Sequence, residues 1–239
     1  MPLLILPNAY GDAVTNMAVD ASLLSKLPAG IAVFRHYGWM EPAITFGYTQ
    51  KWSEVEALFE GDLRLCRRLT GGGIVDHRND WTYALAIQAS LSAAHSQANH
   101  LYLQIHKSLA SALLEQEIQT QLAPCQRDCS QAASTTPQRV SQCFVQPAAN
   151  DVLSADGNKI AGAAMKRTRE GILIQGSVDR TALPTRLDFT ALTKAFTEHL
   201  AAALEIPKGH SDDIRSLFDG QRIQEERSRF ASEAWLKKR

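Results

Sequence analysis

A glycine-rich segment that follows two arginines is the strongest candidate for ligand binding in this 239-residue sequence. It reads Arg67-Arg68-Leu69-Thr70-Gly71-Gly72-Gly73-Ile74-Val75-Asp76-His77. Consecutive glycines let a backbone turn through φ values closed to other residues, so its N–H groups could bind a carboxylate, a phosphate or a developing oxyanion. Arg67 and Arg68 could add charge-assisted hydrogen bonds. On composition alone, a strained loop between strands with two solvated arginines is an equal alternative.

Lys159 and Cys143 are further candidates for carbonyl or acyl chemistry. Lys159 lies within Gly157-Asn158-Lys159-Ile160-Ala161-Gly162. A lysine that faces a pocket is a fixed positive charge that can polarise a carbonyl, whereas a lysine on the outer face of a strand is solvated. Cys143 ends a long polar segment. A cysteine nucleophile needs a partner that stabilises its thiolate and donors for the oxyanion, and the alternative is a small buried apolar residue.

The elements that must hold these residues are a mixture of strands and helices. Apolar patterns predict strands at 2–6, 31–37, 43–46, 63–69, 81–88, 151–154, 159–166 and 172–178. They predict helices at 13–26, 98–118 and 189–204, and a short helix after a capping box formed by Ser53 and Glu56. Asp156-Gly157 between two strands indicates a hairpin, and 123–142 is typical of a long surface loop. This mixture predicts an α+β fold.

Composition and charge exclude several classes of protein. Apolar residues make up 45% and charged residues 21%, which is typical of a globular protein, and we expect one domain over residues 1–239. The 25 basic and 25 acidic residues do not favour nucleic-acid binding. There is no apolar run near the ~20 residues of a membrane span and no secretory signal, so we expect a cytoplasmic protein with no membrane partner. Cys125 and Cys129 lack a second ligand pair, so we expect no metal site.

Several short motifs occur in a characteristic order between about residues 16 and 180. They are Asn16-Met17-Ala18-Val19-Asp20, Phe34–Trp39 with Pro42–Gly47, Arg67–His77, Asn150-Asp151 with Gly157–Gly162, and Gln175-Gly176. Phe230–Trp235 adds a fainter match. Together they resemble the lipoate–protein ligase A and octanoyltransferase family, within the wider biotin/lipoate ligase fold. The resemblance implies a mixed, largely antiparallel sheet flanked by helices.

The resemblance also implies a reaction and a set of site residues. The reaction is transfer of an octanoyl or lipoyl group to a lysine on a lipoyl domain of a dehydrogenase complex or a glycine cleavage protein. Cys143-Phe144 resembles the nucleophile segment of one octanoyltransferase class, which favours octanoyl transfer from acyl carrier protein through a Cys143 thioester, without a cofactor. Lys159 would contact the acyl carbonyl. The substrate-binding positions implied are Arg67, Arg68, Gly71, Gly72, Gly73, His77 and Gly162. His77 would be a proton shuttle or a structural histidine.

Two other readings remain open. The first is a lipoate–protein ligase that uses free lipoate, ATP and magnesium to make lipoyl-AMP. Gly162 is followed by Ala163-Ala164-Met165 where the family usually has Ser-Ala-Gln, and His77 is followed by Arg78-Asn79-Asp80 where ligases have Asp-x-Gly-Asn. The departure after His77 weakens a self-sufficient ligase, and the departure from the whole family at Ala163-Ala164-Met165 leaves room for the second reading. The second is a non-catalytic protein that binds lipoate or a lipoyl domain. The arginine- and glycine-rich loop of biotin ligases is absent from the sequence.

Overall fold

The strands of the computed structural model form two sheets within the part of the chain that it describes, residues 2–59, 63–124, 147–209 and 214–238. The larger sheet has the order β12-β1-β3-β7-β11-β10-β9-β8, with β2 paired to β3. Its strands are β1 (Leu3–Ile5), β2 (Ala9–Gly11), β3 (Ala32–Trp39), β7 (Asp80–Gln88), β8 (Thr120–Leu122), β9 (Val152–Ser154), β10 (Lys159–Arg167), β11 (Gly171–Asp179) and β12 (Lys208–Gly209). The smaller sheet, order β5-β4-β6, contains β4 (Ala43–Phe46), β5 (Arg64–Arg67) and β6 (Ile74–Asp76).

Antiparallel pairing dominates the larger sheet. Every neighbouring pair from β3 through β7, β11, β10 and β9 to β8 is antiparallel. Parallel pairs occur where β1 meets β3 and β12, where β2 meets β3, and where β4 meets β5 in the smaller sheet. The predicted α+β fold with a mixed, largely antiparallel sheet is therefore confirmed.

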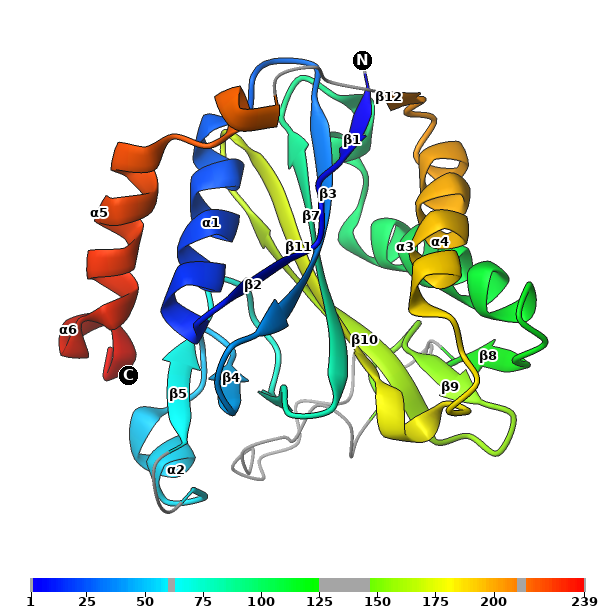
Figure 1. Ribbon diagram of the computed structural model, residues 1–239, viewed down its shortest axis with the longest axis horizontal. Helices are drawn as coiled ribbons and strands as arrows, with labels where there is room; N and C mark the ends of the chain where they lie inside the picture. The colour runs from blue at the N-terminus through cyan, green and yellow to red at the C-terminus, as the bar shows by residue number, and fades with distance from the viewer. Residues whose placement is uncertain (1, 60–62, 125–146, 210–213, 239) are drawn as a thin grey trace.

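Helices cover both faces of the larger sheet (Figure 1). One face carries α1 (Ala13–Lys26) with α5 (Gly220–Ala231), and the other carries α3 (Ala98–Leu114) with α4 (Phe189–Ala203). The side chains of β7 alternate between the two faces of the sheet. Tyr83, Leu85 and Ile87 pack into the core under α3 and α4, whereas Ala84 and Ala86 pack into the core under α1. Small side chains on the α1 face let that helix approach the sheet closely.

Local signals explain the elements that the sequence predicted well. Asp12 accepts a hydrogen bond from the Thr15 N–H at 2.6 Å, which caps α1. Asp188 caps α4 in the same way. Gly157 has φ +86°, a left-handed conformation that suits glycine, in the hairpin between β9 and β10. No helix in the described ranges is both long and apolar enough to cross a membrane.

Two helix predictions are wrong in detail. The short helix α2 (Trp52–Glu56) has Lys51 at its N-cap and no side-chain cap, so the expected Ser53–Glu56 capping box does not form. The helix expected over 98–118 ends at Leu114. It ends there because Glu117 has φ +61° and the Ile118 N–H donates to the Leu113 carbonyl, a Schellman ending made without glycine. Most of the predicted 123–142 loop, with Cys125 and Cys129, lies outside the described residues.

Candidate functional site

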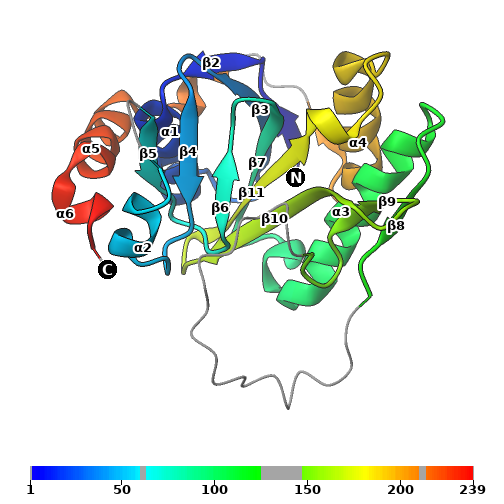
Figure 2. The same cartoon turned by 90° about the horizontal axis from the view of Figure 1, so that it is seen from below.

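A cavity of about 630 Å³ lies where β10 and β11 meet the glycine-rich loop that joins β5 to β6. In Figure 2, which views the molecule from below, β6, β10 and β11 occupy the middle of the view. This volume is in the usual range for small-molecule sites, roughly 300–1,000 Å³. Six of the nine site residues expected from the sequence line it, namely Arg68, Gly72, Gly73, His77, Lys159 and Gly162. Arg67 and Gly71 are not among the lining residues, and Cys143 lies outside the described residues.

Lys159 is held at the cavity wall by a buried ion pair. Its Nζ lies 2.6 Å from Oδ2 of Asp151, and the two side chains are 6% and 4% exposed. The same carboxylate accepts the Ala148 N–H at 2.7 Å. A Cβ at position 162 would lie 2.8 Å from the Lys159 Nζ, so Gly162 leaves the space that the lysine occupies. The result is a positive charge in a fixed place beside the cavity.

Two of the three glycine carbonyl groups in the loop accept hydrogen bonds from Arg68, and the third, that of Gly72, accepts from the Gln50 side chain at 3.0 Å. The Arg68 guanidinium is buried and donates to the carbonyl oxygens of Gly71 and Gly73, each at 3.0 Å. Gly72 has φ +86°, which favours glycine. Among the described residues, the N–H groups of Gly72 and Gly73 have no hydrogen-bond acceptor. Because both residues line the cavity, their N–H groups are available as donors to the oxygen of a bound carbonyl.

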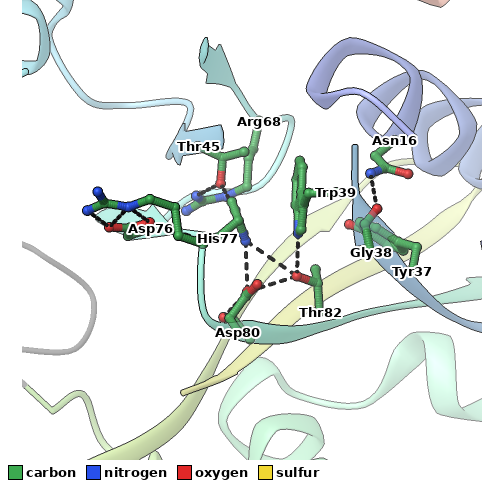
Figure 3. A network of polar contacts seen from close by, with 12 residues as sticks. Asn16, Tyr37, Gly38, Trp39, Thr45, Arg68, Asp76, His77, Asp80 and Thr82 are labelled. Atoms are coloured by element: carbon green, nitrogen blue, oxygen red, sulfur yellow. Dashed lines mark hydrogen bonds and ion pairs between the residues drawn. The ribbon is translucent and has the colours of Figure 1, made fainter. Parts of the chain in front are cut away.

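His77 is part of the network that holds Arg68 (Figure 3). Arg68 donates to the Thr45 hydroxyl at 2.7 Å, and that hydroxyl lies 2.6 Å from Nε2 of His77. Nδ1 of His77 lies 2.7 Å from Oδ2 of Asp80. The imidazole also stacks on Trp39, with ring centroids 3.9 Å apart. Both ring nitrogens are engaged, as in a structural histidine and equally in a histidine that passes a proton between a hydroxyl and a carboxylate.

A second buried network supports the cavity from the side of α1. Gln175 lines the cavity, donates to Asp20 and accepts the Thr70 hydroxyl, both at 2.7 Å. Asp20 is fully buried, and its carboxylate pairs with Arg35 at 2.8 Å and accepts the Tyr37 hydroxyl at 3.0 Å. Burial raises the pKa of Asp20, while Arg35 opposes that effect. The network connects Thr70, the residue before the three glycines, to Gln175 on β11.

Arg67 has a different environment from its neighbour. Its side chain is fully buried and donates to the carbonyl oxygens of Tyr48, Gln50, Trp235 and Leu236. The Trp235 indole N–H donates in return to the Arg67 carbonyl at 2.9 Å. Arg67 therefore joins β5 to the short helix α6 (Glu233–Leu236). The structure does not bring its guanidinium to the cavity.

The sequence analysis did not single out Asp151, Thr45 or Asp80 as individual site residues. Asp151 stood inside a motif, but its partner became identifiable only when β9 was seen to pair with β10. Cys66 is buried, and burial raises the pKa of its thiol to about 12, so it is not a reactive thiol. In the described ranges, no group of three or more His, Cys, Asp or Glu side chains is arranged to hold a metal ion.

Comparison with known proteins gives one family. Residues 12–209 match the family model described as the lipoyl protein ligase A/B catalytic domain. The chain is 30% identical over 179 residues to a protein named octanoyltransferase LipM from Moorella thermoacetica, covering 73% of this chain and 63% of that protein. It is 32% identical over 179 residues to octanoyltransferase LipM from Oceanobacillus iheyensis, covering 72% of this chain and 62% of that protein. The chain thus spans less than two thirds of the length of these relatives.

Solved structures show the same fold at low sequence identity. Protein Ta0514 from T. acidophilum, a putative lipoate protein ligase with bound lipoic acid, superposes with a TM-score of 0.70 at 16% identity. That match covers 100% of this chain and 99% of that protein. A lipoate-protein ligase A bound with ATP superposes with a TM-score of 0.69 at 16% identity, covering 99% of this chain and 98% of that protein.

Proposed function

Because the chain belongs to the lipoyl protein ligase A/B family, we propose that it transfers an octanoyl group from an acyl carrier protein to a lysine of a lipoyl domain. The observation that carries the proposal is the arrangement of the cavity. Lys159, Gly72 and Gly73 all line this one cavity, and the Lys159 ammonium is paired with Asp151 at its wall, which supports a site for a carbonyl oxygen. Relatives named octanoyltransferase favour this reaction over others of the family.

The proposed reaction has two steps, and Cys143 enters it on the sequence motif. In the first step, Cys143 attacks the carbonyl carbon of the octanoyl thioester as a thiolate, and a new C–S bond forms. The bond between that carbon and the donor's sulfur breaks, and the donor leaves as a thiol that carries the proton given up by Cys143. In the second, the amine of the acceptor lysine attacks the acyl-enzyme, an amide forms, and the Cys143 thiol is released. In both steps the carbonyl oxygen becomes negative. Lys159 and the glycine N–H groups stabilise that charge.

Asp151 is a positioning residue in this mechanism. It pairs with the Lys159 ammonium at 2.6 Å and so keeps that charge at the cavity wall. Arg68 and His77 support the glycine loop, because Arg68 donates to two carbonyl oxygens of the loop and to the Thr45 hydroxyl that contacts His77. These bonds hold the loop backbone in place, and a preorganised backbone is what makes an oxyanion site effective.

The test is acyl transfer without nucleotide, followed by intact mass. The protein is mixed with octanoyl carrier protein and an apo lipoyl domain. We expect an octanoyl adduct on the enzyme that is lost in Cys143→Ala, and an octanoylated acceptor. Cys66→Ala is the matched control and keeps the adduct, because Cys66 is buried and its pKa is raised to about 12. Loss of activity in Lys159→Ala supports the role given to Lys159, and substantial turnover in that variant contradicts it.

The second candidate is an ATP-dependent lipoate–protein ligase. Its support is the fold shared with a lipoate-protein ligase A bound with ATP. Against it, His77 is followed by Arg78-Asn79-Asp80, which does not match the Asp-x-Gly-Asn segment of the ligases. If no acyl group moves without nucleotide, but free lipoate, ATP and magnesium modify the acceptor, the ligase replaces the transferase. Binding of lipoate or a lipoyl domain without any turnover indicates the non-catalytic reading.

A further inference from the structure

Two lysine ammonium groups lie against the ring of Tyr48. The Nζ atoms of Lys166 and Lys238 are 5.4 and 5.0 Å from its ring centroid, within cation–π distance. Lys238 is exposed and Lys166 is partly exposed. Neither ammonium is paired with a carboxylate among the described residues. We call Tyr48, Lys166 and Lys238 the basic rim.

The basic rim lies at the edge of the cavity described above. Tyr48 is followed directly by Thr49, Gln50 and Lys51, which line the cavity, and Lys166 is two residues beyond the lining residue Ala164 on β10. Lys238 comes from the segment after α6, whose end lies beside α2 in both overall views (Figures 1 and 2). The rim therefore combines three segments that are distant in the sequence.

Packing beneath Tyr48 holds the rim in place. The Trp235 ring lies 5.6 Å from the Tyr48 ring, and the buried Arg67 guanidinium donates to the Tyr48 carbonyl at 2.9 Å. Other cations nearby have acidic partners. Lys51 pairs with Glu54 at 3.2 Å, and Lys237 pairs with Glu233 at 3.3 Å. Of the lysines named here, all within the described part of the chain, Lys166 and Lys238 are the two whose charge is left for a partner.

We propose that the basic rim docks the acidic surface of the carrier protein that delivers the acyl group, a proposal that rests on the proposed function. The formal net charge of the chain is zero, so this local excess of positive charge is a feature of the rim and not of the whole surface. Complementary charge at the mouth of a site speeds encounter and selects partners. A carrier protein reaches the cavity with a flexible acyl arm, so its body must rest at the cavity's edge.

The rim's charge favours the donor over the acceptor. The acceptor presents a lysine ammonium, which like-charge repulsion from Lys166 and Lys238 disfavours. The donor presents the phosphate of its pantetheine arm and the carboxylates of the carrier protein. The proposal commits to the carrier protein's carboxylates, and the experiment separates them from the phosphate of the arm.

The experiment compares two double variants in the first half-reaction. Lys166→Glu/Lys238→Glu reverses the rim, and Lys107→Glu/Lys194→Glu makes the same change at exposed positions on α3 and α4. The rate of acyl-enzyme formation is measured by intact mass at limiting donor. With octanoyl carrier protein, we expect reversal of the rim to lower the rate about tenfold or more at low ionic strength, and less at high salt. The control variant keeps the parent rate.

Two smaller donors identify the group that the rim binds. Octanoyl-pantetheine lacks both phosphate and protein, and octanoyl-phosphopantetheine adds only the phosphate. Equal rates for parent and rim variant with both small donors support docking of the carrier protein. An equal loss with octanoyl-phosphopantetheine overturns it in favour of a phosphate site. If the rim variant loses rate only in the second step, from pre-acylated enzyme to the lipoyl domain, the rim binds the acceptor and the proposal is overturned. If the rim variant loses no rate with any donor, the proposal is also overturned.

A binding measurement keeps this test independent of the proposed chemistry. Fluorescence anisotropy of labelled carrier protein is recorded with Cys143→Ala protein, with and without the rim reversal. Salt-dependent binding that the reversal abolishes supports the rim even if no acyl group is transferred. Failure of the parent protein to form any acyl-enzyme contradicts the proposed function, whereas normal acylation of the rim variant contradicts only the docking.

Discussion

The ion pair between Lys159 and Asp151 gives a quantitative prediction for stability. Asp151→Asn keeps the size of the side chain but leaves the Lys159 ammonium buried without a counter-charge. The side chains are 6% and 4% exposed and the charged atoms are 2.6 Å apart, so water screens this pair poorly. Removing one partner of such a pair costs about 3–5 kcal/mol of unfolding free energy. Asparagine can still accept a hydrogen bond, so we expect a loss of about 3 kcal/mol.

A double-mutant cycle separates the pair from its surroundings. Lys159→Met should cost a similar amount, because it leaves the Asp151 carboxylate with the Ala148 N–H and no cation. The double variant Asp151→Asn/Lys159→Met has no buried charge at either position, so its loss should be smaller than the sum. We expect a coupling free energy of at least about 2 kcal/mol. The assay is urea unfolding followed by tryptophan fluorescence.

The exposed pair of Lys237 with Glu233 is the matched control. Its side chains are 45% and 82% exposed and its charged atoms are 3.3 Å apart. The same cycle there should give a coupling below about 1 kcal/mol. If the Asp151 and Lys159 substitutions each cost less than about 1 kcal/mol and their costs add, water screens the buried pair as well as the exposed one. Asp151 then does not fix a charge at the cavity wall.

Three further predictions concern the glycine loop, a buried histidine and a buried cysteine. Gly72→Ala should lower the free energy of unfolding by about 1–2 kcal/mol, because φ at this position is +86°. Gly71→Ala should lower it by less than about 0.5 kcal/mol, because an added Cβ there meets no atom within 4 Å. Equal losses for the two variants in urea unfolding would refute this prediction. Burial lowers the pKa of His106 from 6.5, so the unfolded chain binds a proton that the folded chain does not, and stability should fall as pH drops below 6.5. His106→Gln should make that fall shallower in unfolding curves taken at stepped pH, and an unchanged slope would exclude this histidine as the cause. Because burial raises the pKa of Cys66 to about 12, iodoacetamide should label Cys66 only after unfolding, which peptide mass analysis checks.

The parts of the fold that follow from short-range interactions could be predicted from the sequence. The helix expected over 13–26 is α1, because an aspartate cap and an apolar stripe are both local signals. The Asp156-Gly157 hairpin forms for the same reason, since Gly157 alone supplies the left-handed backbone that the turn uses. The helix α3 ended early because Glu117 adopts a left-handed conformation that a non-glycine residue rarely signals. The short strands β2 and β12 exist only through their pairing with β3 and β1.

The two adjacent arginines show what a sequence determines about a site and what packing adds. Neighbouring residues of an extended chain point to opposite faces, so Arg67 and Arg68 had to separate. Nothing in their local sequence says which one turns towards the glycine loop. That depends on the α6 segment, whose carbonyl groups occupy the Arg67 side, while Thr45 of β4 and the glycine carbonyls occupy the Arg68 side. Likewise, the glycines and Lys159 were recognisable by type and spacing. The counter-charge of Lys159 came from the pairing of β9 with β10, because Asp151, the residue just before β9, then lies within 2.6 Å of the lysine.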